Sequence, residues 1–96
     1  MKIQSFDNVW DAISDTPEEA ENMKLRSQLM IVLKEYIARR ALSGAEAAAL
    51  LGVSQPRISE LQQGKINLFS IDKLVTMMAS AGLQIGHIEI IEPKAA

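Results

Sequence analysis

The chain has 96 residues, the length of one domain. A domain of this size buries only about 60% of the surface that its unfolded chain exposes, so a second copy or a partner would add to its stability. The absence of cysteine excludes disulfides and cysteine-based zinc sites, and cytoplasm is the simplest compartment. Because the N-terminus has early acidic residues and no apolar run reaches about 18 residues, we expect neither export nor a membrane span.

The net charge of −2 conceals two regions of opposite charge. Residues 1–23 hold six acidic residues and one Lys, whereas residues 24–65 hold seven basic residues and three Glu. A basic middle region suits a polyanion, and an acidic beginning suits a basic partner. The alternative is that both regions are the solvated faces of ordinary surface helices.

Residues 1–15 are predicted to form an acidic N-terminal segment. Its stretch FDNVWDAI can form a short helical turn with Asp7 as the cap. Acidic groups around an apolar anchor suit a small basic protein partner. The alternative is that the segment only packs on the domain. The candidate contacts to such a partner are Phe6, Val9, Trp10 and Asp11.

Residues 16–82 are predicted to form the main domain, which begins with a long amphipathic helix. Thr16 is a good N-cap, Pro17 suits the first helical position, and Glu19 stands where a capping box requires it. Apolar residues at helical spacing extend this helix to about Arg40. The residues expected to face inward are Leu25, Leu29, Val32, Leu33, Tyr36 and Ile37.

Two short helices are predicted next, on either side of a tight turn. The first, GAEAAALL, is rich in the best helix former and stops at Gly52, which can adopt a left-handed conformation. Ser54 caps the second helix, which tolerates Pro56 in its first turn and runs to about Gln63. This is a helix-turn-helix arrangement. Its expected inward set is Ala47, Ala48, Leu51, Val53, Ile58 and Leu61.

The polar side chains of the second short helix predict contacts with double-stranded DNA. In this arrangement the start of the second helix enters the major groove. Arg can pair bidentately with guanine and Gln with adenine, while Ser, Lys and Asn can reach phosphates. The alternative is a helical hairpin without a nucleic-acid role. The candidate DNA-binding residues are Ser54, Gln55, Pro56, Arg57, Ser59 and Gln62, together with Lys65 and Asn67 in the loop that follows this helix.

One more helix is predicted before the chain changes periodicity. Ser70 is a fair N-cap, Asp72 suits the helix dipole, and Gly82 is a natural stop. The expected inward stripe consists of Ile71, Leu74, Val75 and Met78.

Residues 83–96 are predicted to form a C-terminal strand and tail. The stretch LQIGHIEIIEP is rich in β-branched residues and stops at Pro93. A single strand needs a partner, and the only other candidate is a doubtful KIQSF near the N-terminus. Pairing with the same strand of a second copy would give a two-fold homodimer. The predicted dimer contacts are Ile85, Ile88 and Ile90.

Residues 42–64, LSGAEAAALLGVSQPRISELQQG, resemble the Cro/C1-type (XRE) helix-turn-helix family. The stretch LFSIDKLVTMMASAGLQIGHIEI resembles its HigA-like antitoxin branch. The resemblance implies a mainly α, five-helix, lambda-repressor-like domain with a C-terminal β-strand for dimerisation. Gly44 departs from the family, which commonly has at that position a Gln that contacts a backbone phosphate and braces the recognition helix.

The resemblance also implies a function. Members of this branch often repress their own operon and neutralise a RelE/HigB-like toxin that cleaves messenger RNA, as the antitoxin of a type II toxin-antitoxin pair. The alternative is a stand-alone Cro/C1-type regulator without a toxin partner. DNA binding is common to both.

Catalysis is not expected. His87 is the only histidine, and it lies in the predicted strand; Asp11 and Asp15 are four residues apart, but no other chemical group converges on them. We therefore assign no catalytic residue, no metal ligand and no cofactor.

Overall fold

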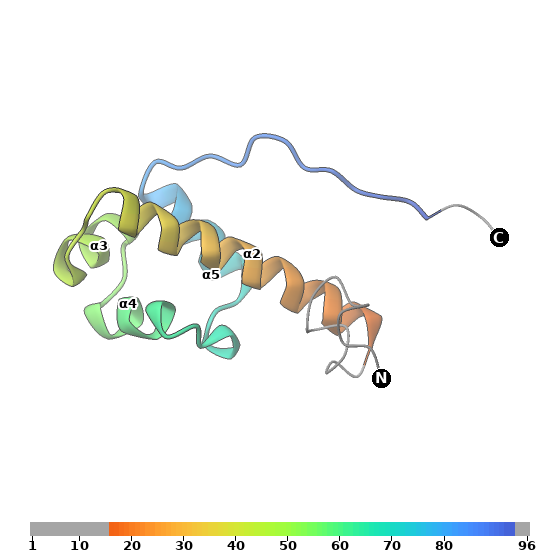
Figure 1. Cartoon of the computed structure of the whole chain (residues 1–96), viewed down its shortest axis with the longest axis horizontal. Coiled ribbons are helices and arrows are strands. Elements are labelled where there is room, and N and C mark those ends of the chain that lie inside the picture. Colours follow the sequence, from red (N-terminus) through yellow and green to blue (C-terminus); the bar gives the residue numbers. More distant parts are fainter. Residues whose placement is uncertain (1–15, 94–96) are drawn as a thin grey trace.

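The structure is a computed structural model that describes residues 16–93. Its α-helices are α2 (Pro17–Arg39), α3 (Gly44–Leu51), α4 (Gln55–Gln62) and α5 (Ile71–Ser80), with a short 3-10 helix, η2 (Ile66–Leu68), between the last two. The short helices gather on the C-terminal half of α2, whose N-terminal end projects beyond them (Figure 1). The predictions for Phe6, Val9, Trp10 and Asp11 lie outside the described residues.

The long helix begins and ends close to where the sequence predicts. The Thr16 hydroxyl accepts a hydrogen bond from the Glu19 amide at 3.0 Å, and Pro17 occupies the first turn. The helix ends at Arg39. The chain then reverses at Ala41, whose φ of 51° is left-handed, and the Leu42 amide donates to the Ile37 carbonyl at 3.1 Å. This hydrogen bond is typical of helix ends that have glycine in the left-handed position, which Ala41 occupies here.

A single apolar core joins all of these elements. Each α-helix contributes at least two buried side chains, η2 contributes Ile66, and the residue between η2 and α5, Phe69, is completely buried. The core side chains with the least exposure are Phe69, Leu33, Leu51, Leu61, Leu74 and Met77. Loss of this core would therefore release every short helix at once.

Two of the inward residues predicted for α2 are in fact exposed. Leu25 is 42% exposed and Val32 is 43% exposed. The core stripe of α2 runs through Met30, Leu33 and Ile37, and Leu25 lies towards the end that projects past the short helices. The sequence shows more apolar positions than the core of one chain covers.

The predicted stripe of α5 has the correct period but is partly misplaced. Ile71 is only half-buried and Val75 is exposed, whereas Met77 is completely buried. The observed stripe is Leu74, Met77, Met78 and the partly buried Ala81. The predicted and observed sets both have spacings of three, four and seven residues, so periodicity alone does not distinguish them.

The predicted C-terminal strand is absent from the described residues. α5 stops as expected, because Gly82 has a φ of 83° and the Leu83 amide donates to the Met78 carbonyl at 2.9 Å. Residues 83–93 then run as an extended segment (Figure 1). A strand requires a neighbouring strand to bond with, and residues 16–93 of one copy offer none.

The five-helix count implied by the resemblance is also unsupported, because the described part of the chain contains four α-helices. Within that part, no helix is both long enough and apolar enough to cross a membrane.

The left-handed Ala41 generates a prediction about stability. A side chain in this conformation costs about 1–2 kcal/mol, a cost that glycine avoids although it loses more entropy on folding. We therefore expect Ala41→Gly to raise the free energy of unfolding by about 0.5–1 kcal/mol. Urea denaturation followed by circular dichroism, at one fixed protein concentration, measures this change.

The opposite substitution at another left-handed helix end is the control. Gly52 has a φ of 70°, so Gly52→Ala should lower the free energy of unfolding by about 1–2 kcal/mol. A less stable Ala41→Gly variant would show that Ala41 is not strained.

Candidate nucleic-acid interface

The turn between α3 and α4 is built around Gly52. Its amide and that of Val53 both donate to the Ala48 carbonyl, which closes the end of α3. A Cβ atom at Gly52 would lie 3.0 Å from Oγ of Ser80, tighter than ordinary contact. The Ser80 hydroxyl in turn donates to the Leu50 carbonyl at 2.8 Å, so α5 is bonded to the end of α3. Conformation and space therefore both favour glycine here.

Both short helices also have a serine N-cap that fixes where the helix begins. At α3, Ser43 and Glu46 form a complete capping box, in which each side chain accepts from the other residue's amide at 3.1 and 2.8 Å. At α4, the Ser54 hydroxyl accepts from the Arg57 amide at 3.4 Å, and Pro56 occupies the first turn. The capping box was not predicted, although its Ser-Gly-Ala-Glu spacing was legible in the sequence.

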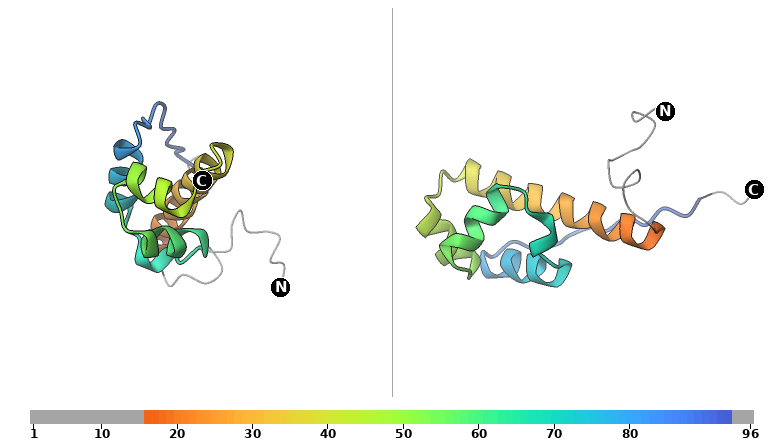
Figure 2. Two further views of the ribbon diagram at one scale, coloured as in Figure 1. Left: turned by 90° about the vertical axis from the view of Figure 1, so that its left-hand side faces the viewer. Right: turned by 90° about the horizontal axis from the view of Figure 1, so that it is seen from below.

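The predicted orientation of α4 agrees with its burial. Ile58 and Leu61 are buried in the core. The remaining side chains include four predicted DNA contacts that are exposed: Gln55, Pro56, Ser59 and Gln62. Ser59 also accepts a hydrogen bond from the Gln63 amide group at 3.0 Å, which leaves its hydroxyl hydrogen free to donate elsewhere. α3 and α4 lie next to each other, with α2 behind them (Figure 2).

A shallow depression of about 360 Å³ separates the start of α3 from α4. Polar residues from both helices line it, over an apolar floor; the lining is Ile37, Leu42, Ser43, Gly44, Gln55, Ile58, Ser59 and Gln62. Gly44 contributes no side chain, and a Cβ there would lie 3.9 Å from Oε1 of Gln55. The position where the resembled family has its Gln is thus open and adjoins Gln55.

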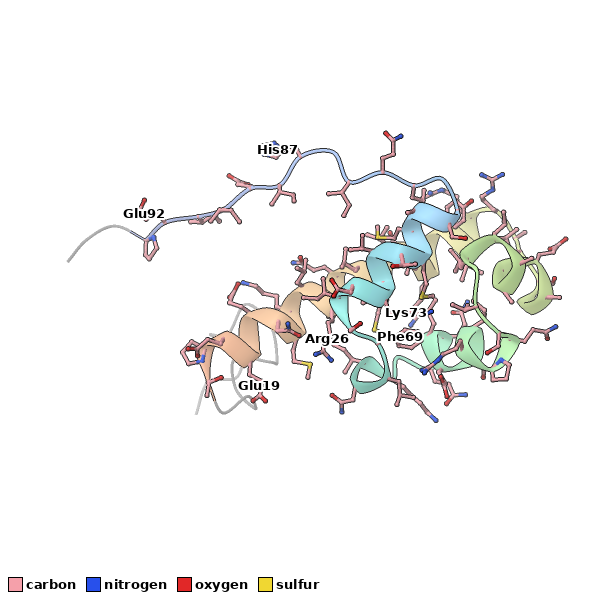
Figure 3. All side chains as sticks on the ribbon, turned by 180° about the vertical axis from the view of Figure 1, so that it is seen from behind. Glu19, Arg26, Phe69, Lys73, His87 and Glu92 are labelled. Carbon is pink, nitrogen blue, oxygen red and sulfur yellow. The ribbon has the colours of Figure 1, made fainter. Side chains whose placement is uncertain are left out.

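Arg57 differs from the other predicted readers, because its side chain contacts residues beyond α4 as well as on it. Its Nη1 lies 3.0 Å from Oε1 of Glu60 and donates to the Leu68 carbonyl at 3.2 Å. Its guanidinium carbon lies 5.6 Å from the centre of the Phe69 ring. Figure 3 labels Phe69 among the helices. The sequence does not reveal these contacts, since Leu68 is eleven residues away.

Basic side chains from two elements gather near the end of α4. Lys65 and Asn67 are exposed, and neither side chain has a hydrogen bond or ion pair with another described residue. Lys34 of α2 lines a second depression of about 140 Å³ together with Gly64 and Ile66, which places it beside the same loop. Lys34 is a candidate phosphate contact that the sequence pattern missed, because it belongs to a helix distant in the chain.

The predicted dimer contacts lie away from this surface. Ile85, Ile88 and Ile90 belong to the extended segment, and Ile88 and Ile90 are 68% and 85% exposed. His87 and Glu92, labelled on the same segment in Figure 3, lie clear of the helices. The structure therefore brings the predicted DNA contacts together on α4 and its flanking loop and leaves the predicted dimer contacts uncovered.

Two short helices joined by a tight turn, the second with an exposed polar face, define the class of helix-turn-helix proteins. Comparison with known proteins agrees. A helix-turn-helix domain family model matches residues 12–91. A solved structure described as an XRE-family transcriptional regulator is 33% identical, with a TM-score of 0.70, over 80% of this chain and 89% of that one. A search of curated proteins finds no match.

The chain therefore belongs to the helix-turn-helix domain family, and its helix-turn-helix is of the XRE type. Proteins of this class are DNA-binding transcriptional regulators. The HigA-like branch stays a prediction.

Proposed function

We propose that the chain is a repressor that reads a palindromic operator through α4 as a homodimer. The observation that carries this proposal is the exposure of Gln55, Ser59 and Gln62 on a helix whose other face is fixed in the core. A glutamine amide can donate to and accept from adenine, and a serine hydroxyl can reach a base or a phosphate. Gln55 and Ser59 are the proposed base readers.

The flanking residues supply attraction to the DNA backbone. Ser54, Lys65 and Asn67 are the proposed phosphate contacts, to which the structure adds Lys34. Because the whole chain carries a charge of −2, attraction depends on this local basic surface. Binding should therefore weaken steeply as salt is raised.

The proposed roles predict different effects for two substitutions. Gln55→Ala should weaken specific binding by about 1–3 kcal/mol and leave binding to unrelated DNA unchanged. Lys65→Ala should weaken binding to all sequences and reduce the slope against salt concentration by about 1. Fluorescence anisotropy with duplexes from upstream of the coding region, at several salt concentrations, measures both.

Gln28→Ala is the control, because Gln28 is an exposed glutamine of α2 outside the proposed surface. Its affinity should equal that of the unmodified chain. Equal affinity of Gln55→Ala and Gln28→Ala for the specific duplex would remove Gln55 from the reading surface.

The proposed dimer is supported by the extended segment. Its isoleucines are exposed in one copy, and no backbone amide of residues 84–93 donates to another described residue. Pairing with the same segment of a second copy would satisfy those amides and cover the isoleucines. The predicted strand would then form only on dimerisation.

A charge placed in this segment tests the dimer. Ile88→Lys or Ile90→Lys should reduce the mass measured by light scattering to that of one chain, since residues two apart share one face of a strand, pairing that covers this face would bury both positions, and a buried charge is costly. Ile31→Lys is the control, because Ile31 is a half-exposed isoleucine of α2. If only Ile31→Lys is monomeric, the interface lies on α2.

A second proposed activity is capture of a small basic toxin, as the antitoxin of a pair. The supporting observation is the segregation of charge. Glu18, Glu19 and Glu21 are exposed at the projecting end of α2, apart from α4 (Figure 1), and Asp7, Asp11 and Asp15 precede them in the sequence. A toxin that cleaves RNA needs a positive face, which an acidic surface complements.

Deletion of residues 1–15 tests the antitoxin proposal. The truncated chain should bind operator DNA normally and capture less of a co-expressed small basic toxin encoded beside it, because that segment holds half of the acidic residues of region 1–23. Affinity pull-down measures the capture. Undiminished capture would contradict a role for the segment.

A further inference from the structure

We propose that Arg57 is a positioning residue that joins α4 to the loop of residues 65–69, and that it does not contact a base. This inference rests on the proposed DNA binding, because it concerns how the two parts of that surface are held relative to each other. It reverses the role that the sequence suggests for the one arginine of α4.

The geometry of the guanidinium carries the inference. One nitrogen, Nη1, serves both Glu60 on the same helix and the carbonyl of Leu68 at the end of η2. The guanidinium carbon lies 5.6 Å from the centre of the Phe69 ring, and Phe69 is completely buried. A planar guanidinium that donates from its edge and can lie over an aromatic ring suits this combination better than the ammonium group of lysine.

The ion pair between Arg57 and Glu60 is partly buried, which strengthens it. The side chains of Arg57 and Glu60 are 42% and 30% exposed, so water competes less than it does for a fully exposed ion pair. Nη1 already donates to both Glu60 and the Leu68 carbonyl. Any movement of the guanidinium towards a base edge would therefore weaken these two hydrogen bonds and the contact with the Phe69 ring.

The same contact completes the attachment of η2 to α4. At the near end of the loop, the Lys65 amide donates to the Glu60 carbonyl at 3.1 Å. At the far end, Arg57 holds the Leu68 carbonyl. The 3-10 helix is thus attached to α4 at both ends. Of the proposed phosphate contacts, Lys65 is at the first attachment and Asn67 lies between the two. Arg57 fixes the distance from these contacts to the base readers of α4.

Removal of Glu60 separates positioning from reading, because the two roles predict opposite signs. If Arg57 positions the loop, Arg57→Ala should weaken specific binding by about tenfold, and Glu60→Ala should weaken it in the same direction but less, because Arg57 loses the partner that orients it towards the Leu68 carbonyl. If Arg57 reads a base, Glu60→Ala frees it and removes a negative charge near DNA, so binding should be equal or stronger. Glu35→Ala, at an exposed carboxylate of α2, controls for the change in net charge.

A second measurement identifies the base pairs at which the Arg57→Ala variant discriminates less well than the unmodified chain. Specific duplexes with each base pair changed in turn are titrated by fluorescence anisotropy against the full chain and Arg57→Ala. Positioning predicts that Arg57→Ala lowers discrimination at the base pairs that Gln55→Ala also affects. Loss of discrimination at a single separate base pair would overturn the proposal.

Two further variants guard against general unfolding. Arg57→Met keeps an apolar stem against Phe69 and should retain the fold, measured by circular dichroism, while it loses specific affinity. Arg57→Lys keeps the charge but not the fork, and it should fall well below the unmodified chain. Full affinity of Arg57→Lys would identify a simple charge contact with phosphate and refute positioning.

If the unmodified chain binds no DNA, the proposed function itself fails. If the unmodified chain binds DNA and Glu60→Ala binds equally well, only this inference fails.

Discussion

The left-handed turn at Gly52 is the constraint on which the recognition surface depends. It sets the angle at which α4 leaves α3, and the Ser80 hydroxyl beneath it bonds the end of α3 to α5. Because a Cβ at Gly52 would lie only 3.0 Å from the Ser80 hydroxyl, the turn is closely packed and the direction of α4 has little freedom. The exposed glutamines and serine of α4 can thus be preorganised for DNA before any contact is made.

The local features of the fold were legible in the sequence. Caps such as Thr16, Ser54 and Ser70 predicted the helix starts, and each accepts the expected backbone hydrogen bond. Gly52 and Gly82 predicted helix ends, and both have positive φ. These predictions succeed because each depends on residues within one turn of helix, where side-chain chemistry and backbone geometry are directly linked.

Features that depend on distant residues were predicted less well. The phase of the α5 stripe is decided by the helices against which it packs, so Met77 was missed and Val75 wrongly placed inside. Two partners of Arg57, Leu68 and Phe69, lie on η2 and beyond it, and no spacing rule connects them with Arg57. The C-terminal strand was read from composition, yet a strand forms only where another lies beside it. In each case the missing information was the position of another segment.

The shortness of α4 has a genetic consequence. A helix of eight residues is too short to persist alone in water, where about 12–15 residues are needed, so its shape comes from the core beneath it. Substitutions at buried sites such as Leu61 or Phe69 should therefore abolish DNA binding as thoroughly as substitutions on the exposed face of α4. In a random screen for mutants that lose DNA binding, the core offers more targets than the exposed face of α4, and most mutants recovered would be folding mutants in which that face is unchanged in sequence.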